Sequence, residues 1–429
     1  MMNILYDLGF LIFGLIYLPY LVVTKRYRHG LASRMGILPE RVKDISSKGK
    51  VIWIHAVSVG EIKAASILAP LLRKTFPDHT LLFSTVTHTG NKVAKTIATG
   101  DEGVFYLPFD ISFIVNRVIR CIKPEIFLCL ETELWPNLIS SLSSFNSKVI
   151  LVNGRISDKS FSGYKKIRFI TSSILKKFSL IVMQSEKDKD RILDLGAPKD
   201  KVFATGNLKF DLAIVDASSE RHEIREKLNI PKEDILLVAG STHRGEEEQI
   251  LNCFSKLKNS YKNLRLLIAP RHIERTGEIE GLLNKLNFTP VKVSSLDANK
   301  ASTSLERDSS QVLILDAIGD LKNMYSASDI VFVGGSLVKK GGQNPIEPAV
   351  FSKPIIIGKF TFNFQDVVRS FLEDNSCIQV GDEEGLCSAI TSLLDNPNER
   401  KKLGARAKDT VDKNSGSSLN TLKLIQQIL

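Results

Sequence analysis

Short apolar runs alternate with amphipathic stretches along most of the chain. The apolar runs of the first half predict strands over residues 51–57, 80–86, 104–109, 126–130, 148–153, 180–184 and 202–205. Helical periodicity lies between them, for example over residues 61–75, 111–122 and 162–178. Strands that alternate with helices are typical of βα units, which build a parallel sheet with helices on its faces.

The alternation stops over the polar residues 216–225 and restarts after Pro231. Further apolar runs predict strands over 235–240, 264–269, 312–315, 330–334 and 355–357, with helices over 246–257, 274–286 and 383–394. We therefore expect an α/β fold with two Rossmann-like, doubly wound domains, over residues 28–215 and 233–429, joined by a linker over 216–232. Ligands of such sheets bind beyond the carboxyl ends of the strands, so we expect the two domains to face each other across a cleft.

The N-terminal segment differs from the rest of the chain. Residues 8–24 carry no charge, and Lys25, Arg26 and Arg28 follow closely. A membrane-spanning helix needs about 20 apolar residues, so this short run fits either a span or an interfacial helix bent at Pro19. Basic residues follow the run and none precedes it, which argues against a cleaved signal peptide. We predict that residues 1–27 are a single membrane anchor, a signal-anchor, with the domains on the cytoplasmic side.

The formal net charge of +11 favours anionic partners, such as an acidic membrane or a phosphorylated small molecule. No nucleic-acid-binding motif is present, so we expect no nucleic acid as a partner. The five cysteines form no C-x-x-C pair, which indicates reduced thiols. Asp188 and Asp190 match the D-x-D of metal-dependent transferases, but they lie in a stretch with the pattern of an ordinary charged helix. Because the seven histidines also lack zinc-site spacing, we predict neither a metal nor a cofactor.

The most unusual polar residues come directly after predicted strands. Glu61 follows the run 51–57 and would begin a helix, where the positive end of the helix dipole keeps a carboxylate ionised. An ionised carboxylate at this place could accept a proton from an attacking hydroxyl. The alternative is a capping role without chemistry, because Ser58 and Glu61 also fit the S-x-x-E capping box.

Two further candidates follow strands of the first domain. Glu131 comes after the run 126–130 and could stabilise positive charge, or it could be a surface acid before a helix that begins at Pro136. Lys209 lies in the segment 206–211 and could pair with a phosphate or a carboxylate, or it could be a solvated lysine.

The second domain offers candidates for anion binding after two of its predicted strands. Backbone N–H groups and the hydroxyls of Ser241 and Thr242, with His243 beside them, could bind an anion. Arg271, which follows Pro270, could clamp a phosphate. Neither a P-loop nor a dinucleotide fingerprint is present.

Glycines gather around the strand predicted over residues 330–334. Gly334, Gly335, Gly341 and Gly342 would let the backbone approach a phosphate or a ribose closely. Glu347, near a helix start, could accept hydrogen bonds from ribose hydroxyls. A mobile surface loop is the alternative, but the glycine density, the strand end and the polar helix start together favour a nucleotide site.

Together these motifs resemble one family, the 3-deoxy-D-manno-octulosonic acid (Kdo) transferases of lipopolysaccharide synthesis. The resemblance rests on HAVSVGE (55–61), ETELWPN (131–137), NGRIS (153–157), GNLKFD (206–211), GSTHRGEEE (240–248), APRH (269–272), VGGSLV (333–338) and GGQNPIEP (341–348). It implies a GT-B fold, in which the first domain receives the acceptor and the second binds the nucleotide. It also implies inverting, metal-independent transfer of Kdo from CMP-Kdo onto the lipid A precursor lipid IVA at the inner membrane, once or more than once.

By position, the resemblance assigns roles to residues of this chain. Glu61 matches the general base, and Glu131 and Lys209 match residues that stabilise the transition state. Because that transition state has oxocarbenium character, a Glu61 of near-normal pKa would suffice. The CMP contacts are matched by Pro270, Arg271, Gly319, Asp320, Leu321, Asn344, Pro345, Ile346 and Glu347.

Two positions depart from the family pattern. Gln343 stands where the family usually has His, and Asp320 stands where it usually has Glu. Both replacements keep hydrogen-bonding capacity, so they put individual contacts in doubt but not the class of donor.

Two other functions remain open. A GT-B enzyme for another nucleotide sugar, either a transferase or an epimerase, would keep the same fold. A non-catalytic, membrane-tethered binding protein would keep the anchor, but the joint presence of Glu61, Arg271 and Glu347 argues against a degenerate site.

Overall fold

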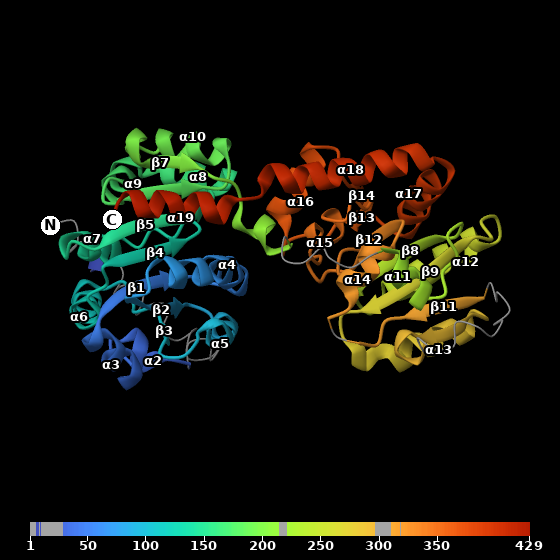
Figure 1. Ribbon diagram of the computed structural model, residues 1–429. Helices are drawn as coiled ribbons and strands as arrows, with labels where there is room; N and C mark the ends of the chain where they lie inside the picture. The colour runs from blue at the N-terminus through green and yellow to red at the C-terminus, as the bar shows by residue number, and fades with distance from the viewer. Residues whose placement is uncertain (1–5, 8, 10–28, 214–220, 297–309, 318) are drawn as a thin grey trace. The chain divides into compact units, whose positions relative to one another are not determined.

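The structure is a computed structural model, and it describes residues 6–7, 9, 29–213, 221–296, 310–317 and 319–429. The chain forms two compact units (Figure 1). The first unit comprises Met1–Asp211 together with Ser415–Leu429, and the second comprises Leu212–Asn414.

A parallel seven-stranded sheet forms the centre of the first unit, in the order β3-β2-β1-β4-β5-β6-β7. Its strands are β1 (Lys50–His55), β2 (His79–Thr85), β3 (Gly103–Tyr106), β4 (Ile126–Leu130), β5 (Lys148–Gly154), β6 (Leu180–Met183) and β7 (Val202–Ala204). The helices are α2 (Leu31–Arg34), α3 (Glu40–Lys48), α4 (Val59–Thr75), α5 (His88–Ile97), α6 (Ser112–Ile122), α7 (Pro136–Ser144), α8 (Asp158–Lys166), α9 (Arg168–Leu175), α10 (Glu186–Asp194) and α19 (Ser417–Gln427), with 3-10 turns η1 (Lys199–Lys201) and η2 (Leu208–Ala213).

Both faces of this sheet are buried under helices. In β1, Val51 and Trp53 pack into a core with α3, α6, α7 and α9. Ile52 and Ile54 point to the other face and pack with α4, α5 and α19. A parallel strand that is buried on both faces is a continuous apolar run, which is why the strands could be predicted from the sequence.

The second unit repeats this architecture, with strands in the order β10-β11-β9-β8-β12-β13-β14. Its strands are β8 (Ile235–Thr242), β9 (Leu264–Pro270), β10 (Thr289–Lys292), β11 (Gln311–Ile314), β12 (Ile330–Val333), β13 (Ile355–Gly358) and β14 (Ile378–Val380). The helices are α11 (Arg221–Lys227), α12 (Glu247–Lys258), α13 (Thr276–Lys285), α14 (Leu321–Ala327), α15 (Ile346–Ala349), α16 (Gln365–Glu373), α17 (Glu383–Asp395) and α18 (Pro397–Asn414), with 3-10 turns η3 (Ile273–Arg275) and η4 (Val293–Ser295). Two parallel seven-stranded α/β sheets are consistent with a GT-B protein.

Every strand expected from the sequence is present, but two strands were missed. The strand β10 has no fully buried residue and contains Pro290, and β14 is only three residues long, so neither gives a clear apolar run. The helix expected over 162–178 is two helices that meet at Ile167. Since α8 has no buried residue and α9 buries Thr171, Ile174 and Leu175, only the second half carries a core-facing pattern.

Part of the expected linker is an ordered piece of the second unit. Helix α11 lies within residues 216–232, and its Arg225 is buried. The Arg225 guanidinium donates to the carbonyl oxygens of Ala327, Pro231 and Asp234 and pairs with Asp329 at 2.9 Å. The charged side chain of Arg225 therefore attaches α11 to the rest of the second unit.

The end of the chain returns to the first unit, which differs from the expected domain over 233–429. The two carboxylate oxygens of Asp211 accept the N–H groups of Gly416 and Ser418, each at 2.7 Å. Helix α19 then packs on α4 and buries Leu422 and Ile425 in the core of the first unit (Figure 1). A local sequence pattern does not show to which unit α19 belongs, because α19 has the same amphipathic pattern as a helix of either unit.

The predicted membrane anchor, residues 1–27, falls almost entirely outside the described residues. Within the part of the chain that is described, no helix has the length and apolar character needed to cross a membrane. Asp7, one of the described residues there, accepts hydrogen bonds from Asn137 Nδ2 at 2.7 Å and from the Ser112 N–H at 3.1 Å.

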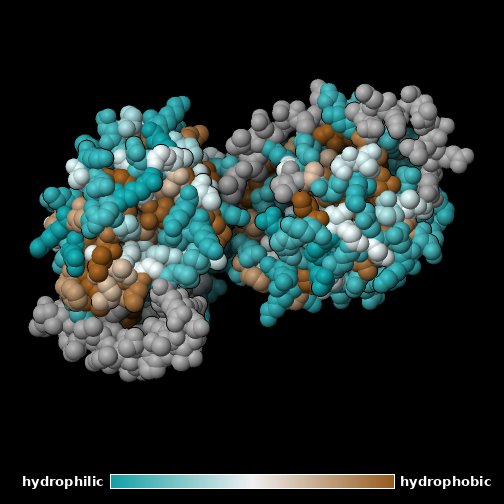
Figure 2. Space-filling model, turned by 90° about the horizontal axis from the view of Figure 1, so that it is seen from below, coloured by the Kyte–Doolittle hydropathy of each residue, from teal (hydrophilic) through white to brown (hydrophobic). Residues whose placement is uncertain are grey.

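Hydrophobic side chains interrupt the hydrophilic surface of the first unit on the face shown in Figure 2. The exposed large hydrophobic residues of this unit include Leu31, Met35, Ile37 and Phe113.

Candidate active site

Glu61 lies in the first turn of α4, at the carboxyl end of β1. Its Oε2 accepts the Val57 N–H at 2.6 Å, and its Oε1 accepts the Ser58 hydroxyl at 2.8 Å. The contact from Glu61 back to the preceding turn resembles half of a capping box, but the Ser58 side chain accepts no N–H of the helix. These two bonds fix the carboxylate, which is 6% exposed, at the edge of the sheet.

Glu131 and Lys209 come together at the same edge. Glu131 follows β4, the neighbour of β1, and has a left-handed backbone with a φ of 56°. The Lys209 Nζ lies 3.9 Å from the Glu131 Oε1. Since Lys209 is only 8% exposed, the alternative of a solvated lysine is wrong.

Three amide side chains explain how Lys209 reaches this edge from β7. The Asn153 Oδ1, at the end of β5, accepts the Leu208 N–H at 3.0 Å, and the Asn207 Oδ1 accepts the Lys209 N–H at 3.0 Å. The Asn207 Nδ2 in turn donates to the Gln184 Oε1 at 3.0 Å. Asn153 of the NGRIS segment and Asn207 of the GNLKFD segment therefore have a structural role. Their hydrogen bonds direct the turn after β7 toward β4 and β5.

Two carboxyl groups near this edge, Glu61 and Glu133, have raised pKa values. Burial, and then the nearby charge of Glu131, raises the pKa of Glu61 to about 8 against the opposite effect of the Val57 N–H and the Ser58 hydroxyl. Burial, and then the charge of Glu131, raises the pKa of Glu133 to about 7. The expectation of an ionised Glu61 with a near-normal pKa is therefore wrong, because desolvation outweighs the helix dipole and both hydrogen bonds.

In the second unit, the predicted anion-binding residues follow four strands that are neighbours in the sheet, β11, β9, β8 and β12. Parallel strands place these loops along a single carboxyl edge. The residues are Ser241 and Thr242 at the end of β8 with His243 after it, Pro270 at the end of β9 with Arg271 after it, Gly319, Asp320 and Leu321 after β11, and Asn344, Pro345, Ile346 and Glu347 after β12.

At the carboxyl end of β8 the backbone lies very close to the backbone of neighbouring segments. Ser241 has a left-handed φ of 54°, and the Thr242 carbonyl accepts the Arg271 N–H at 3.0 Å. A Cβ on Gly334 would lie 2.5 Å from the Ser241 carbonyl oxygen, so only glycine fits there. The Thr242 Oγ1 is buried with no partner among the described atoms, and the Arg271 side chain is exposed. An unpaired buried hydroxyl is the kind of group that a ligand satisfies.

Glu246 holds this edge together, and it was not among the residues predicted from the sequence. Its fully buried carboxylate accepts the N–H groups of His243 at 2.9 Å, Gly335 at 2.6 Å, and Ser336 and Leu337 at 2.8 Å each. It therefore ties the loop after β8 to the glycine-rich loop after β12. The GEEE string could have suggested it, but the sequence gives no sign of which acid points inward.

The remaining contacts at this edge involve residues of the GGQNPIEP segment. The Gln343 Nε2 lies 3.3 Å from the His243 Nε2, so glutamine at this position does contact the loop after β8. The Asn344 side chain donates to the Glu347 Oε1 at 3.2 Å and accepts the Ile346 N–H at 3.1 Å. Burial, and then the charges of His272 and Lys340, lowers the pKa of His243 to about 4.

The D-x-D string has a structural explanation. Asp188 lies in α10, where its carboxylate accepts the Ile156 N–H at 2.8 Å and the Ser185 hydroxyl at 2.5 Å. Among the described residues, no group of three or more His, Cys, Asp or Glu side chains is arranged to hold a metal ion.

Two parallel seven-stranded α/β units, with acids at the carboxyl edge of one sheet and glycine-rich loops at the carboxyl edge of the other, have the architecture of a GT-B glycosyltransferase. The family profile of 3-deoxy-D-manno-octulosonic-acid transferase matches residues 29–212, and that of glycosyl transferases group 1 matches residues 220–410. The chain is 36% identical over 412 residues to a 3-deoxy-D-manno-octulosonic acid transferase of Haemophilus influenzae, covering 95% of this chain and 93% of that protein. The protein belongs to the Kdo transferase family.

The chain is also similar to a longer protein in sequence and to a solved structure in fold. A bifunctional glycosyltransferase/methyltransferase of Fusobacterium nucleatum is 40% identical over 359 residues, which cover 82% of this chain but only 54% of that longer protein. A solved structure of a glycosyltransferase from Rickettsia africae superimposes with a TM-score of 0.52 at 17% identity, over 89% of this chain and 99% of that one. The structural likeness supports the fold.

Proposed function

We propose that the protein transfers Kdo from CMP-Kdo onto the lipid A precursor lipid IVA, with inversion at the anomeric carbon and without a metal or another cofactor. The convergence of Glu61, Glu131 and Lys209 at one edge of the first unit carries this proposal, because it assembles an acid-base group and a charge pair in a chain of the Kdo transferase family. The acceptor binds at this edge.

In the proposed reaction, an acceptor hydroxyl attacks the anomeric carbon of Kdo. A new carbon–oxygen bond forms, the bond to the phosphate oxygen breaks, and CMP leaves with the bonding electrons. Glu61 takes the hydroxyl proton in its ionised form, and a carboxylate with a pKa of about 8 is a stronger base than one of ordinary pKa while it still ionises close to neutral pH. The Lys209 ammonium and the Glu131 carboxylate stabilise the charges that develop at the reacting centre.

The donor binds along the carboxyl edge of the second unit. Its phosphate meets the N–H groups and hydroxyls after β8 and the Arg271 guanidinium after β9, and its ribose meets Asn344 and Glu347. The unpaired Thr242 hydroxyl and the left-handed Ser241 support this placement.

We further propose that residues 1–27 anchor the enzyme at the cytoplasmic face of the inner membrane, where lipid IVA resides. The uncharged run 8–24 and the basic residues after it support the anchor. The exposed Leu31, Met35, Ile37 and Phe113 supply further apolar surface for contact with lipid.

Incubation of the purified chain with CMP-Kdo and lipid IVA, with and without a metal chelator, tests this function. Mass spectrometry should show lipid IVA gaining whole Kdo increments in both conditions, and the number of increments gives the number of transfers. Turnover of UDP-N-acetylglucosamine in place of CMP-Kdo would contradict the proposed donor and favour an epimerase or another transferase.

A further inference from the structure

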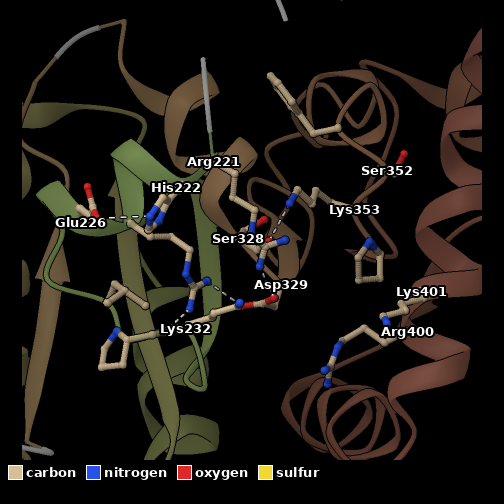
Figure 3. A pocket seen from close by; sticks show the side chains of 15 residues that line it. Arg221, His222, Glu226, Lys232, Ser328, Asp329, Ser352, Lys353, Arg400 and Lys401 are labelled. Atoms are coloured by element: carbon tan, nitrogen blue, oxygen red, sulfur yellow. Dashed lines mark hydrogen bonds and ion pairs between the residues drawn. The ribbon is translucent and has the colours of Figure 1, made fainter. Parts of the chain in front are cut away.

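A pocket of about 1010 Å³ lies in the second unit, away from the donor edge. Its lining includes the residues just before β8, β12 and β13, so it opens at the amino ends of these strands. Helices α11 and α18 supply two further walls (Figure 3). The donor-binding loops follow the opposite, carboxyl ends of the same sheet, and the pocket is therefore a separate site.

The pocket is strongly basic. Its acids are Glu226 and Asp329. Its cations are Arg221, Arg225, Lys232, Lys353, Arg400 and Lys401. Even when the buried Lys353 is left out, the cations outnumber the acids by three, so the pocket carries an excess of positive charge.

The acid of the inner wall, Asp329, is already paired. One oxygen of Asp329 pairs with Arg221 at 2.6 Å, and the other pairs with Arg225 at 2.9 Å and accepts the Leu236 N–H at 2.9 Å. The buried Lys353 Nζ donates to the Ser328 carbonyl at 2.8 Å. Burial, and then the charge of Arg221, lowers the pKa of Lys353 to about 7, so this side chain carries only part of a positive charge at neutral pH. Asp329 is therefore not available to neutralise the remaining cations.

The outer wall presents cations to the pocket. Arg400 and Lys401 project from α18 toward the side occupied by α11 (Figure 3). One Arg400 nitrogen donates to the Leu393 carbonyl at 2.9 Å, which orients the guanidinium. Lys232 and Lys401 are exposed and form no ion pair with any described residue.

We infer that this pocket binds a ligand with two or more phosphate groups. An excess of at least three cations exceeds what one phosphate can neutralise, and the guanidinium groups of Arg221 and Arg400 match the geometry of phosphate oxygens. The pocket is also much larger than a single phosphate needs. The ligand is either a soluble phosphorylated molecule or the headgroup of an anionic membrane lipid, since both present the same chemistry.

Calorimetric titration of the full chain with inorganic pyrophosphate tests a soluble ligand. Co-sedimentation with vesicles of cardiolipin, a lipid with two phosphates in its headgroup, in phosphatidylcholine tests a membrane lipid. The test variant is Lys232→Gln/Arg400→Gln/Lys401→Gln, which leaves the buried Arg225 and Lys353 intact. The matched control is Lys262→Gln/Lys285→Gln/Lys402→Gln, which removes the same charge from exposed positions of the second unit outside the pocket lining.

Pyrophosphate binding at least about 10-fold weaker in the test variant, with the control unchanged, supports a soluble ligand. Vesicle binding that weakens only in the test variant, without pyrophosphate binding, supports a lipid headgroup. Equal weakening in both variants, or binding of neither probe by the native protein, overturns the inference. Circular dichroism of the test variant shows whether the fold is intact.

Discussion

The Lys209 Nζ and the Glu131 Oε1 lie 3.9 Å apart, and the same Glu131 charge raises the pKa of Glu61. One carboxylate therefore lies near the Lys209 cation and also affects the pKa of Glu61, the proposed base. The protonation of Glu61 depends on Glu131, which makes the cluster testable through its pH dependence.

Glu131→Gln should shift the acid limb of the pH profile for kcat/KM to lower pH by about one unit. Loss of the Glu131 charge removes a cause that raises the pKa of Glu61, so Glu61 ionises at lower pH. Glu133→Gln is the matched control, because Glu133 has the smallest effect on the pKa of Glu61 and should shift the profile less. An acid limb that stays in place in Glu131→Gln would show that Glu61 is not the titrating base.

Glu61→Gln should stabilise the protein at high pH. A carboxyl group whose pKa is raised by folding favours the folded state below its unfolded pKa of about 4.5, and this contribution is lost as pH rises through about 8. A neutral glutamine has no proton to lose, so its contribution to stability does not change with pH. The free energy of unfolding of the variant, measured with urea, should exceed that of the native chain by up to about 4 kcal/mol at pH 9 and by little at pH 5. Glu40→Gln, at an exposed acid of the same unit, should change stability by less than about 0.5 kcal/mol at either pH.

Glu246→Gln should weaken both the fold and the donor site. The amide has one acceptor oxygen for the four N–H groups that the carboxylate binds, and its NH₂ group points at donors. We expect a loss of about 2–4 kcal/mol in the free energy of unfolding and weaker binding of CMP. Glu248→Gln, at a neighbouring exposed acid, should change neither the free energy of unfolding nor the binding of CMP. If both variants behaved alike, Glu246 would not hold the two loops together.

Gly334→Ala should disturb the donor site through the backbone. The new Cβ would lie 2.5 Å from the Ser241 carbonyl oxygen, so one of the two loops must move. We expect a destabilisation of about 1–3 kcal/mol, measured by urea unfolding, together with weaker binding of CMP in calorimetry. Gly277→Ala in α13 is the control, because its Cβ meets no atom within 4 Å and alanine should stabilise that helix slightly. Normal CMP affinity in Gly334→Ala would show that the close approach of these loops is not needed.

Much of the fold could be predicted because both sheets are parallel and buried. Runs such as 126–130 are apolar on both faces, and the polar residues that follow them, such as Glu131 and Ser241, are then expected at the carboxyl edge. The pKa of Glu61 could not be predicted, because it depends on how deeply the first turn of α4 is buried. The return of α19 and the inward orientation of Glu246 depend on tertiary contacts between distant segments, and these leave no local pattern.

The most direct test of the account compares Kdo transfer by the native chain and by Glu61→Gln, with CMP-Kdo and lipid IVA as substrates and mass spectrometry as the readout. The account predicts that Glu61→Gln lowers the rate of transfer at least about 100-fold while its affinity for CMP stays at the native value. A folded Glu61→Gln variant that transfers Kdo at the native rate would contradict the assignment of Glu61 as the base.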